Sequence, residues 1–306
     1  MASTRMSPRE RALRPGVTVI GSVAVDHIDD APRSPGGCPS FATIALTAFP
    51  GPGRIVTRWA ARDSALFTDL ASTHQPPITV LPSSTTSACG LKYSGDRRLM
   101  TIDAIGDEWT LSELRGVAID TTWVHVAPLV RSDFAVAALR GLAKGHRLAY
   151  DGQGLVRAPR VGVMKLDSAY DPAILNVISV LKMAEEEAEV VAGERFGLEA
   201  AHRLRVPEIV VTFGAEGCDL YVGGRMRHVP AARRVLDVQS TGAGDVFTVA
   251  YVCGRARGDE PLEAARNASR LVAEMLEARR ATSGDALAVP LGGQVWPRVP
   301  PRRPGR

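Results

Sequence analysis

The 306-residue sequence has few aromatic residues, few cysteines and no long apolar run. Phe, Trp and Tyr make up 5% of the chain, which argues against base stacking on nucleic acid as a main activity. The 4 cysteines have no paired spacing, so we expect neither a disulfide framework nor a zinc site, and a reducing compartment is favoured. No apolar stretch reaches the roughly 18 residues of a membrane span, and no secretory signal opens the chain. We therefore expect a cytoplasmic protein that contacts no membrane.

Much of the net charge of +4 lies at the two ends of the chain. Residues 1–15 are a basic N-terminal tail, and residues 285–306 are rich in Pro and Arg. Such segments are more often solvated than bound to nucleic acid, and we predict no nucleic-acid partner. The chain of 306 residues is long enough for one large α/β domain or two modest ones, and residues 16–284 lie between the two tails.

Strand and helix patterns alternate along this central region. The hydrophobic pattern predicts buried strands at 17–23, 54–60, 122–127 and 177–181, and helices at 64–71, 133–143, 246–255 and 261–280. This alternation is typical of a predominantly parallel sheet covered by helices. One stretch differs, because two alternating runs at 85–93 and 97–104 flank the turn Ser94-Gly95-Asp96 and predict a β-hairpin.

The stretch from Ser240 to Phe247 reads Ser-Thr-Gly-Ala-Gly-Asp-Val-Phe and carries the clearest chemistry. Gly242 and Gly244 let a ligand approach the backbone closely, and the N-terminus of a following helix favours an anion. A carboxylate in the same turn would repel that anion, so Asp245 is better suited to take a proton from a nucleophile that attacks it. An ordinary capped helix start explains the local string about as well.

The whole string resembles the C-terminal motif of the ribokinase-like (PfkB) carbohydrate kinase family. The resemblance implies that Asp245 is the catalytic base and that Gly242, Ala243 and Gly244 form the anion hole, next to Thr241 on the nucleotide side. It also implies that residues 16–284 form one three-layer α/β/α ribokinase-like kinase domain with a predominantly parallel sheet. A small β lid would comprise residues 86–104 and residues near 24–36, and ATP and Mg²⁺ would be the cofactors.

On the acceptor side, Asp26 follows the first strand, where it is either a turn residue or a ligand for sugar hydroxyls. Gly36 and Gly37 resemble the Gly-Gly element that lies over the sugar in this family. Phe41 stands where family members commonly have Asn, which argues against ribose as the substrate. The string from Asp151 to Arg157, with Gln153 between them, is either a structural turn or part of the cleft, and similar strings occur in some family members.

On the donor side, the turn from Thr212 through Gly214 to Gly217 resembles the family turn that contacts the nucleotide. The string beginning at Lys182 resembles the family's Lys-Pro-Asn-x-x-Glu, and it implies that Lys182 contacts the nucleotide and that Glu187 helps organise Mg²⁺. The resemblance also places Asn267 in the adenine pocket. Two departures stand out, since Ala184 replaces the family Asn and Gln239 replaces an Asp often tied to a monovalent cation.

The resemblance covers residues 17–283 and implies ATP-dependent phosphorylation of a hydroxyl on a small molecule. The first candidate acceptor is a cyclitol such as myo-inositol, or an unusual sugar of specialised metabolism. A nucleoside kinase of the same fold is the second, because an aromatic residue in the cleft could stack on a base. A ligand-binding protein that has lost catalysis is a rival reading, and a homodimer formed through the lid is possible. A dinucleotide-dependent oxidoreductase is disfavoured, since no Gly-x-Gly-x-x-Gly follows the first strand.

Overall fold

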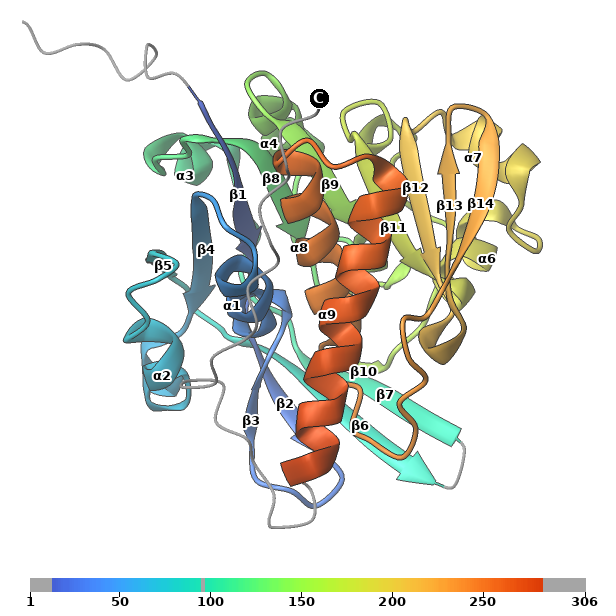
Figure 1. The fold of residues 1–306 in the computed structure, drawn as a ribbon. Coiled ribbons are helices and arrows are strands. Elements are labelled where there is room, and N and C mark those ends of the chain that lie inside the picture. The colour runs from blue at the N-terminus through green and yellow to red at the C-terminus, as the bar shows by residue number, and fades with distance from the viewer. Residues whose placement is uncertain (1–12, 95–96, 283–306) are drawn as a thin grey trace, which may run out of the picture.

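The computed structural model describes residues 13–94 and 97–282, which form two sheets (Figure 1). The larger sheet is parallel except at the β12–β13 and β13–β14 pairs. Its strands, in spatial order, are β14 (Arg225–Pro230), β13 (Gly217–Val222), β12 (Glu208–Thr212), β11 (Val180–Ala184), β9 (Arg147–Asp151), β8 (Thr121–Ala127), β1 (Arg14–Gly21), β4 (Gly53–Trp59) and β5 (Ile78–Pro82). The predicted parallel sheet is confirmed.

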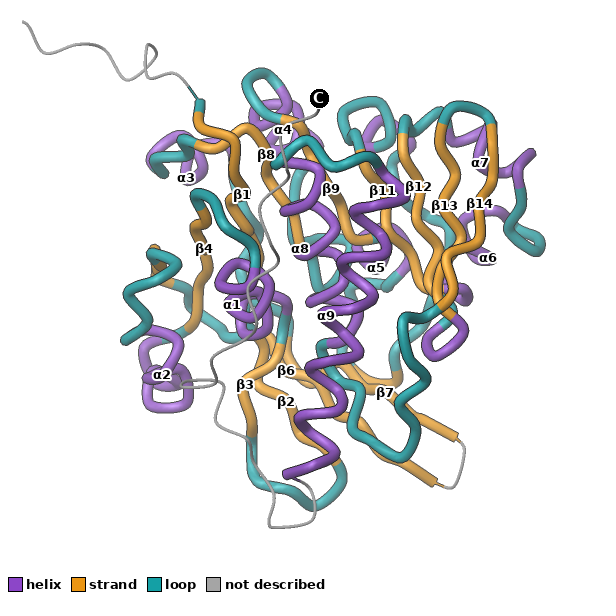
Figure 2. The backbone as a smooth tube through the Cα atoms, viewed as in Figure 1, coloured by secondary structure: helices purple, strands orange, loops and turns teal. Residues whose placement is uncertain are grey.

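Helices cover both faces of this sheet, as Figure 2 shows. One face packs against α1 (Cys38–Ala48), α8 (Ala243–Ala256) and α9 (Pro261–Thr282). The other face packs against α3 (Leu111–Gly116), α4 (Val136–Ala143), α5 (Gln153–Val156), α6 (Glu185–Ala192) and α7 (Leu198–Leu204). Successive strand residues alternate between the two cores: Trp123 of β8 joins the first and Val124 the second. The three-layer architecture is therefore confirmed.

The smaller sheet lies across the carboxyl ends of the parallel strands (Figure 1). Its strands, in spatial order, are β10 (Gly162–Val163), β7 (Arg97–Ala104), β6 (Ser87–Ser94), β2 (Ala24–Ile28) and β3 (Ser34–Gly36). The predicted hairpin is the β6–β7 pair, and its turn residues Gly95 and Asp96 lie outside the described residues. The predicted β lid is thus confirmed, with β10 as an additional strand of two residues that has too little pattern to be seen in the sequence.

Several predicted elements differ from the structure by up to three residues in their bounds, and one also differs in type. The helix expected at 64–71 is a 3₁₀ segment, Ala61–Phe67, followed by the single turn α2 (Thr68–Ala71). The strand expected at 177–181 is β11, which begins and ends three residues later. Lys182 lies within this strand, although it is charged. Its side chain is in fact buried and paired with a carboxylate in the sheet.

Helix α8 is fixed to the sheet by a buried ionic cluster at its carboxyl end. Glu208, at the start of β12, accepts a hydrogen bond from the Tyr251 hydroxyl (2.7 Å). The same carboxylate accepts hydrogen bonds from Nη2 and Nε of Arg255, at 2.7 and 3.0 Å. Tyr251 and Arg255 both lie on α8, so this cluster fixes the position of the helix whose other end carries Asp245.

We expect Glu208→Leu to lower the free energy of unfolding by about 3 kcal/mol, because the partly buried Arg255 and the buried Tyr251 would both lose their charged hydrogen-bond partner. Tyr251→Phe removes a single hydrogen bond and should cost about 1 kcal/mol. Urea denaturation of the two variants measures both values. Equal effects of the two substitutions would contradict this role for the Glu208 carboxylate.

Within residues 13–94 and 97–282, no helix combines the length and the apolar character that crossing a membrane requires. All four cysteines lie in this part of the chain, and each is buried with a free thiol. The predicted tails at 1–15 and 285–306 lie almost entirely outside the described residues, apart from the start of β1.

Candidate active site

The motif at 240–247 forms the N-terminus of α8, at the carboxyl edge of the parallel strands. Gly242 is the N-cap, with φ 81° and ψ −4°, a left-handed conformation that favours glycine. The N–H groups of the first turn of a helix have no partner within the helix and, with the helix dipole, attract anions. The backbone around Gly242 to Gly244 therefore has the geometry of an anion hole.

Two side chains hold this loop in place. The ring of Phe41 on α1 is 6% exposed and lies beneath Gly242, where an added Cβ would come within 2.5 Å of the ring carbons. Arg279 on α9 donates hydrogen bonds to the carbonyls of Gln239 (3.2 Å) and Thr241 (2.7 Å). The guanidinium carbon of Arg279 is also 5.9 Å from the centre of the Phe41 ring. Phe41 thus supports the loop from below.

Asp245 lies in the first turn of α8, in a crowded and highly charged environment. Burial raises the pKa of its carboxyl group to about 7, and the negative charge of Asp151 adds to this rise. Lys182 and Arg157 oppose the shift, and Asp26 contributes to it. A carboxyl group with a pKa near neutrality is suited to accept a proton from an alcohol during the reaction.

Lys182 and Asp151 are neighbours on the same face of the sheet. They are paired in the register between β11 and β9, and this face is the one that packs against α1 and α8. Lys182 Nζ lies 3.6 Å from Asp151 Oδ1 and 3.1 Å from the position that a Cβ on Gly244 would occupy. Burial alone would lower the pKa of Lys182, but Asp151, Glu187 and Asp245 outweigh it and raise the pKa. The lysine is therefore a buried cation directly below the anion hole.

Glu187 and Arg157 lie beside this pair. Oε2 of Glu187 accepts a hydrogen bond from the backbone N–H of Ala184 (2.9 Å) at the start of α6. Its Oε1 lies 3.8 Å from Nη2 of Arg157. The predicted donor-side residues Lys182 and Glu187 and the predicted acceptor-side Arg157 are thus brought into one charged cluster with Asp245.

The lid supplies the opposite wall of the site. Asp26 on β2 is 6% exposed and packs against Gly36 of β3, where an added Cβ would overlap its carboxylate. Gly37 is the N-cap of α1. Cys38 follows it, and burial together with the nearby charge of Asp245 raises the pKa of its thiol. The predicted Gly-Gly element therefore lies between the lid and the predicted base.

Other predicted residues have structural partners. The side-chain amide of Gln153 donates a hydrogen bond to the carbonyl of Pro128 (2.6 Å), which is consistent with the structural-turn reading. The hydroxyl of Thr212 donates to the carbonyl of Met183 (3.3 Å). Gly214 and Gly217 form the turn between β12 and β13, next to the carboxyl end of β11. Their contact with a nucleotide stays a prediction.

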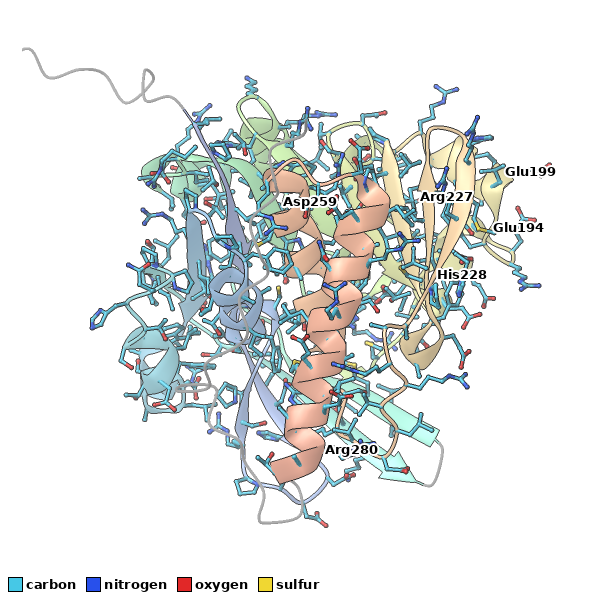
Figure 3. The ribbon with its side chains drawn as sticks, viewed as in Figure 1. Glu194, Glu199, Arg227, His228, Asp259 and Arg280 are labelled. Carbon is cyan, nitrogen blue, oxygen red and sulfur yellow. The ribbon has the colours of Figure 1, made fainter. Side chains whose placement is uncertain are left out.

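Asn267 lies apart from this cluster. Its amide is 3.5 Å from Oδ2 of Asp259, which follows the carboxyl end of α8, whereas the anion hole is at the amino end. A 14-residue helix spans about 21 Å. Figure 3 shows Asp259 and Arg280 at opposite ends of α9, with Arg280 on the side of the lid. Asn267 could therefore contact only the distant end of a long donor, and its assignment to an adenine pocket stays a prediction.

The acidic side chains of the site suit a cation that is held mainly by water and by the phosphates of the substrate. Within the described parts of the chain, no group of three or more His, Cys, Asp or Glu side chains is arranged to hold a metal ion. Glu187 is engaged by a backbone N–H and lies near an arginine. Mg²⁺ usually keeps several waters and binds substrate phosphates with one or two carboxylates. The residues therefore fit Mg²⁺ with Glu187 in an outer position.

Sequence reasoning missed two residues of the site and left a third undecided. Cys38 and Arg279 have no signal in the sequence, because their roles depend on how α1 and α9 pack against the loop. Asp151 stood at the end of a predicted strand, which is where ligands gather in parallel sheets. Only the register between β9 and β11 brings it next to Lys182.

Comparison with known proteins agrees with this geometry. Residues 163–286 match the pfkB family carbohydrate kinase profile. The curated relative inositol 3-kinase of Zea mays is 33% identical over 117 residues, which are 38% of this chain and 27% of that protein. The chain therefore spans only about a quarter of the length of this relative.

Two solved structures show the same fold. One is a pyrophosphate-dependent kinase in the ribokinase family complexed with a pyrophosphate analog and myo-inositol, with a TM-score of 0.72 and 22% identity over 85% of this chain and 94% of that chain. The other is the ribokinase of Arabidopsis thaliana complexed with ribose and ATP, with a TM-score of 0.68 and 17% identity over 94% and 96%. The chain therefore has the ribokinase fold, and its residues 163–286 match the pfkB family of carbohydrate kinases.

Proposed function

We propose that this chain transfers the γ-phosphoryl group of ATP to a hydroxyl of a sugar or cyclitol, with Asp245 as the general base. The observation that carries the proposal is the position of Asp245. Its carboxyl group has a pKa of about 7 and follows the anion-hole backbone directly, between a buried lysine and the β lid.

In the proposed reaction the acceptor hydroxyl gives its proton to Asp245, and its oxygen forms a bond to the transferred phosphorus as the bond to the leaving phosphate breaks. Backbone N–H groups at Gly242 to Gly244 hold the charge on the transferred group, and Lys182 adds a positive charge below them. Mg²⁺ would supply further neutralisation of the phosphates. The lid excludes water, which would otherwise compete as the acceptor.

A polyhydroxylated acceptor suits the lid side of the site better than a nucleoside does. Asp26, held against Gly36, offers a carboxylate to hydroxyl groups, and Arg157 offers hydrogen-bond donors. The nucleoside alternative rested on Phe41 as a stacking platform. That ring is 6% exposed and packs beneath Gly242. The nucleoside alternative therefore loses its main support. A cyclitol such as myo-inositol is the first acceptor to test, and the homodimer through the lid stays a prediction.

The test is phosphoryl transfer by the purified protein with Mg²⁺, using a panel of sugars, inositols, aminocyclitols and nucleosides. Each acceptor is offered with ATP and, separately, with pyrophosphate, and ³¹P NMR identifies the products. We expect turnover with ATP and one acceptor class. Turnover with pyrophosphate alone would overturn the donor assignment. Nucleotide binding without transfer to any acceptor would favour the rival reading of a ligand-binding protein.

A further inference from the structure

Asp151 is buried at the centre of the site in a way that its structural contacts do not explain. Its side chain is 2% exposed, and its Oδ1 accepts no hydrogen bond from the described residues. Among the described residues, the cation paired with that oxygen is Lys182, whose Nζ is 3.6 Å away, which is longer than a direct hydrogen bond. Burying a carboxylate with so little compensation costs stability. A functional reason for its presence is therefore needed.

Asp151 and Lys182 act on the same neighbour. Lys182 lies directly below Gly244, the residue before Asp245. Asp151 lies opposite Lys182 in the register between β9 and β11, and its Oδ1 is 3.6 Å from the ammonium group of that lysine. The two opposite charges act on the Asp245 carboxyl group in opposite directions, since Asp151 favours its protonated form and Lys182 its ionised form.

We propose, on the basis of the function proposed above, that Asp151 is a positioning residue of the reaction. It keeps Lys182 under the anion hole, and its negative charge makes Asp245 a stronger proton acceptor. A base with a higher proton affinity takes the proton of the attacking hydroxyl more readily, provided that it is still ionised at the working pH. The opposite charges of Asp151 and Lys182 together set the proton affinity of Asp245.

The other charged or titratable groups that face Asp245 come from three further elements. Arg157, after α5, opposes Asp151, whereas Asp26 on β2 acts in the same direction as Asp151. Cys38 on α1 stays a neutral thiol, because burial and the charge of Asp245 raise its pKa. None of these three residues is paired with Lys182 in the sheet, as Asp151 is.

The test compares the pH dependence of turnover in the wild-type protein, Asp151→Asn, Lys182→Met and Lys182→Arg. In Asp151→Asn the acid limb should move to lower pH by about one unit, which corresponds to a roughly tenfold change in the proton affinity of the base. In Lys182→Met it should move to higher pH. Lys182→Arg keeps the charge, and its acid limb should stay near that of the wild type. Asp120→Asn, at the amino end of β8 where Asp120 pairs with Arg14, is the matched control and should leave the limb unchanged.

A second measurement does not depend on activity. In protein labelled with ¹³C at the aspartate carboxyl groups, the signal that is lost in Asp245→Asn reports the titration of Asp245. It should titrate at lower pH in Asp151→Asn and at higher pH in Lys182→Met. These shifts without any phosphoryl transfer would refute the proposed function, and with it the role of Asp151 in the reaction, and would leave only the electrostatic effect of Asp151 on Asp245. The opposite result is a slower Asp151→Asn enzyme in which neither the acid limb of the pH–rate profile nor the NMR titration of Asp245 has shifted. That result would overturn the inference and leave the function intact.

Discussion

Asp245→Asn is expected to lower the rate of phosphoryl transfer by about 1,000-fold while donor binding persists, because asparagine cannot accept the hydroxyl proton. The substitution keeps the size of the side chain and the start of α8. Residual turnover would come from the anion hole and from positioning, as it does when a single member of a catalytic group is removed. Steady-state kinetics and calorimetric titration with the donor measure the two effects. Turnover within a few-fold of wild type would rule out Asp245 as the base.

The same assignment fixes the shape of the pH profile. A carboxyl group with a pKa of about 7 is half ionised near that pH. The wild-type rate should therefore fall about tenfold for each unit below pH 6 and reach a plateau above about pH 8. The residual rate of Asp245→Asn should lack this acid limb. An acid limb that persists in the variant would have to come from another group, such as Asp133, whose pKa burial raises to about 6.

The pH dependence of the melting temperature tests the pKa of the same carboxyl group independently of activity. The pKa of Asp245 is higher in the folded protein than in the unfolded chain, so folding favours the protonated form. The cost of ionising this partly buried group is absent below the pKa of the unfolded chain, grows as the pH rises towards 7, and is constant above that. Asp245→Asn removes that cost, so its melting temperature should exceed that of the wild type at pH 8 and match it at pH 4. This result would also show that its loss of activity is not a loss of folding.

The order of the motifs was enough to predict the layers of this fold. The string at 240–247, the Gly36–Gly37 pair and the alternation of strands and helices each constrain the chain locally, and together they fit one architecture. The β6–β7 hairpin could be predicted because its two alternating runs have helices on neither side. Strand bounds were predicted less well, and β11 continues past Leu181 because the charge of Lys182 is buried and paired with Asp151.

Contacts between elements could not be predicted, because they depend on register and packing. Asp151 and Lys182 are 31 positions apart, and only the pairing of β9 with β11 makes them neighbours. Phe41 was predicted to face the acceptor because its motif position is on the sugar side in the family. The packing of α1 against α8 instead places its ring beneath Gly242. A side chain's direction is set by its own helix, but what it meets is set by the neighbouring helix.

The contact between the Phe41 ring and Gly242 predicts the second large effect. Gly242→Ala should lower turnover by at least 100-fold. An added Cβ would meet the Phe41 ring at 2.5 Å, and the left-handed conformation at φ 81° is itself unfavourable for alanine by about 1 kcal/mol. The loop must move to relieve both, which displaces the N–H groups of the anion hole. Losing one such donor typically costs a factor of about 100 to 1,000.

Two further variants separate the clash from the backbone strain. Gly193, after α6, also has a positive φ of 73°, but an added Cβ there meets nothing within 4 Å. Gly193→Ala should therefore lose about 1 kcal/mol of stability and keep full turnover. In the double variant Phe41→Ala, Gly242→Ala, the ring is gone and part of the activity should return. If the double variant is no faster than Gly242→Ala, backbone strain alone displaces the loop, and the Phe41 ring does not set the geometry of the anion hole.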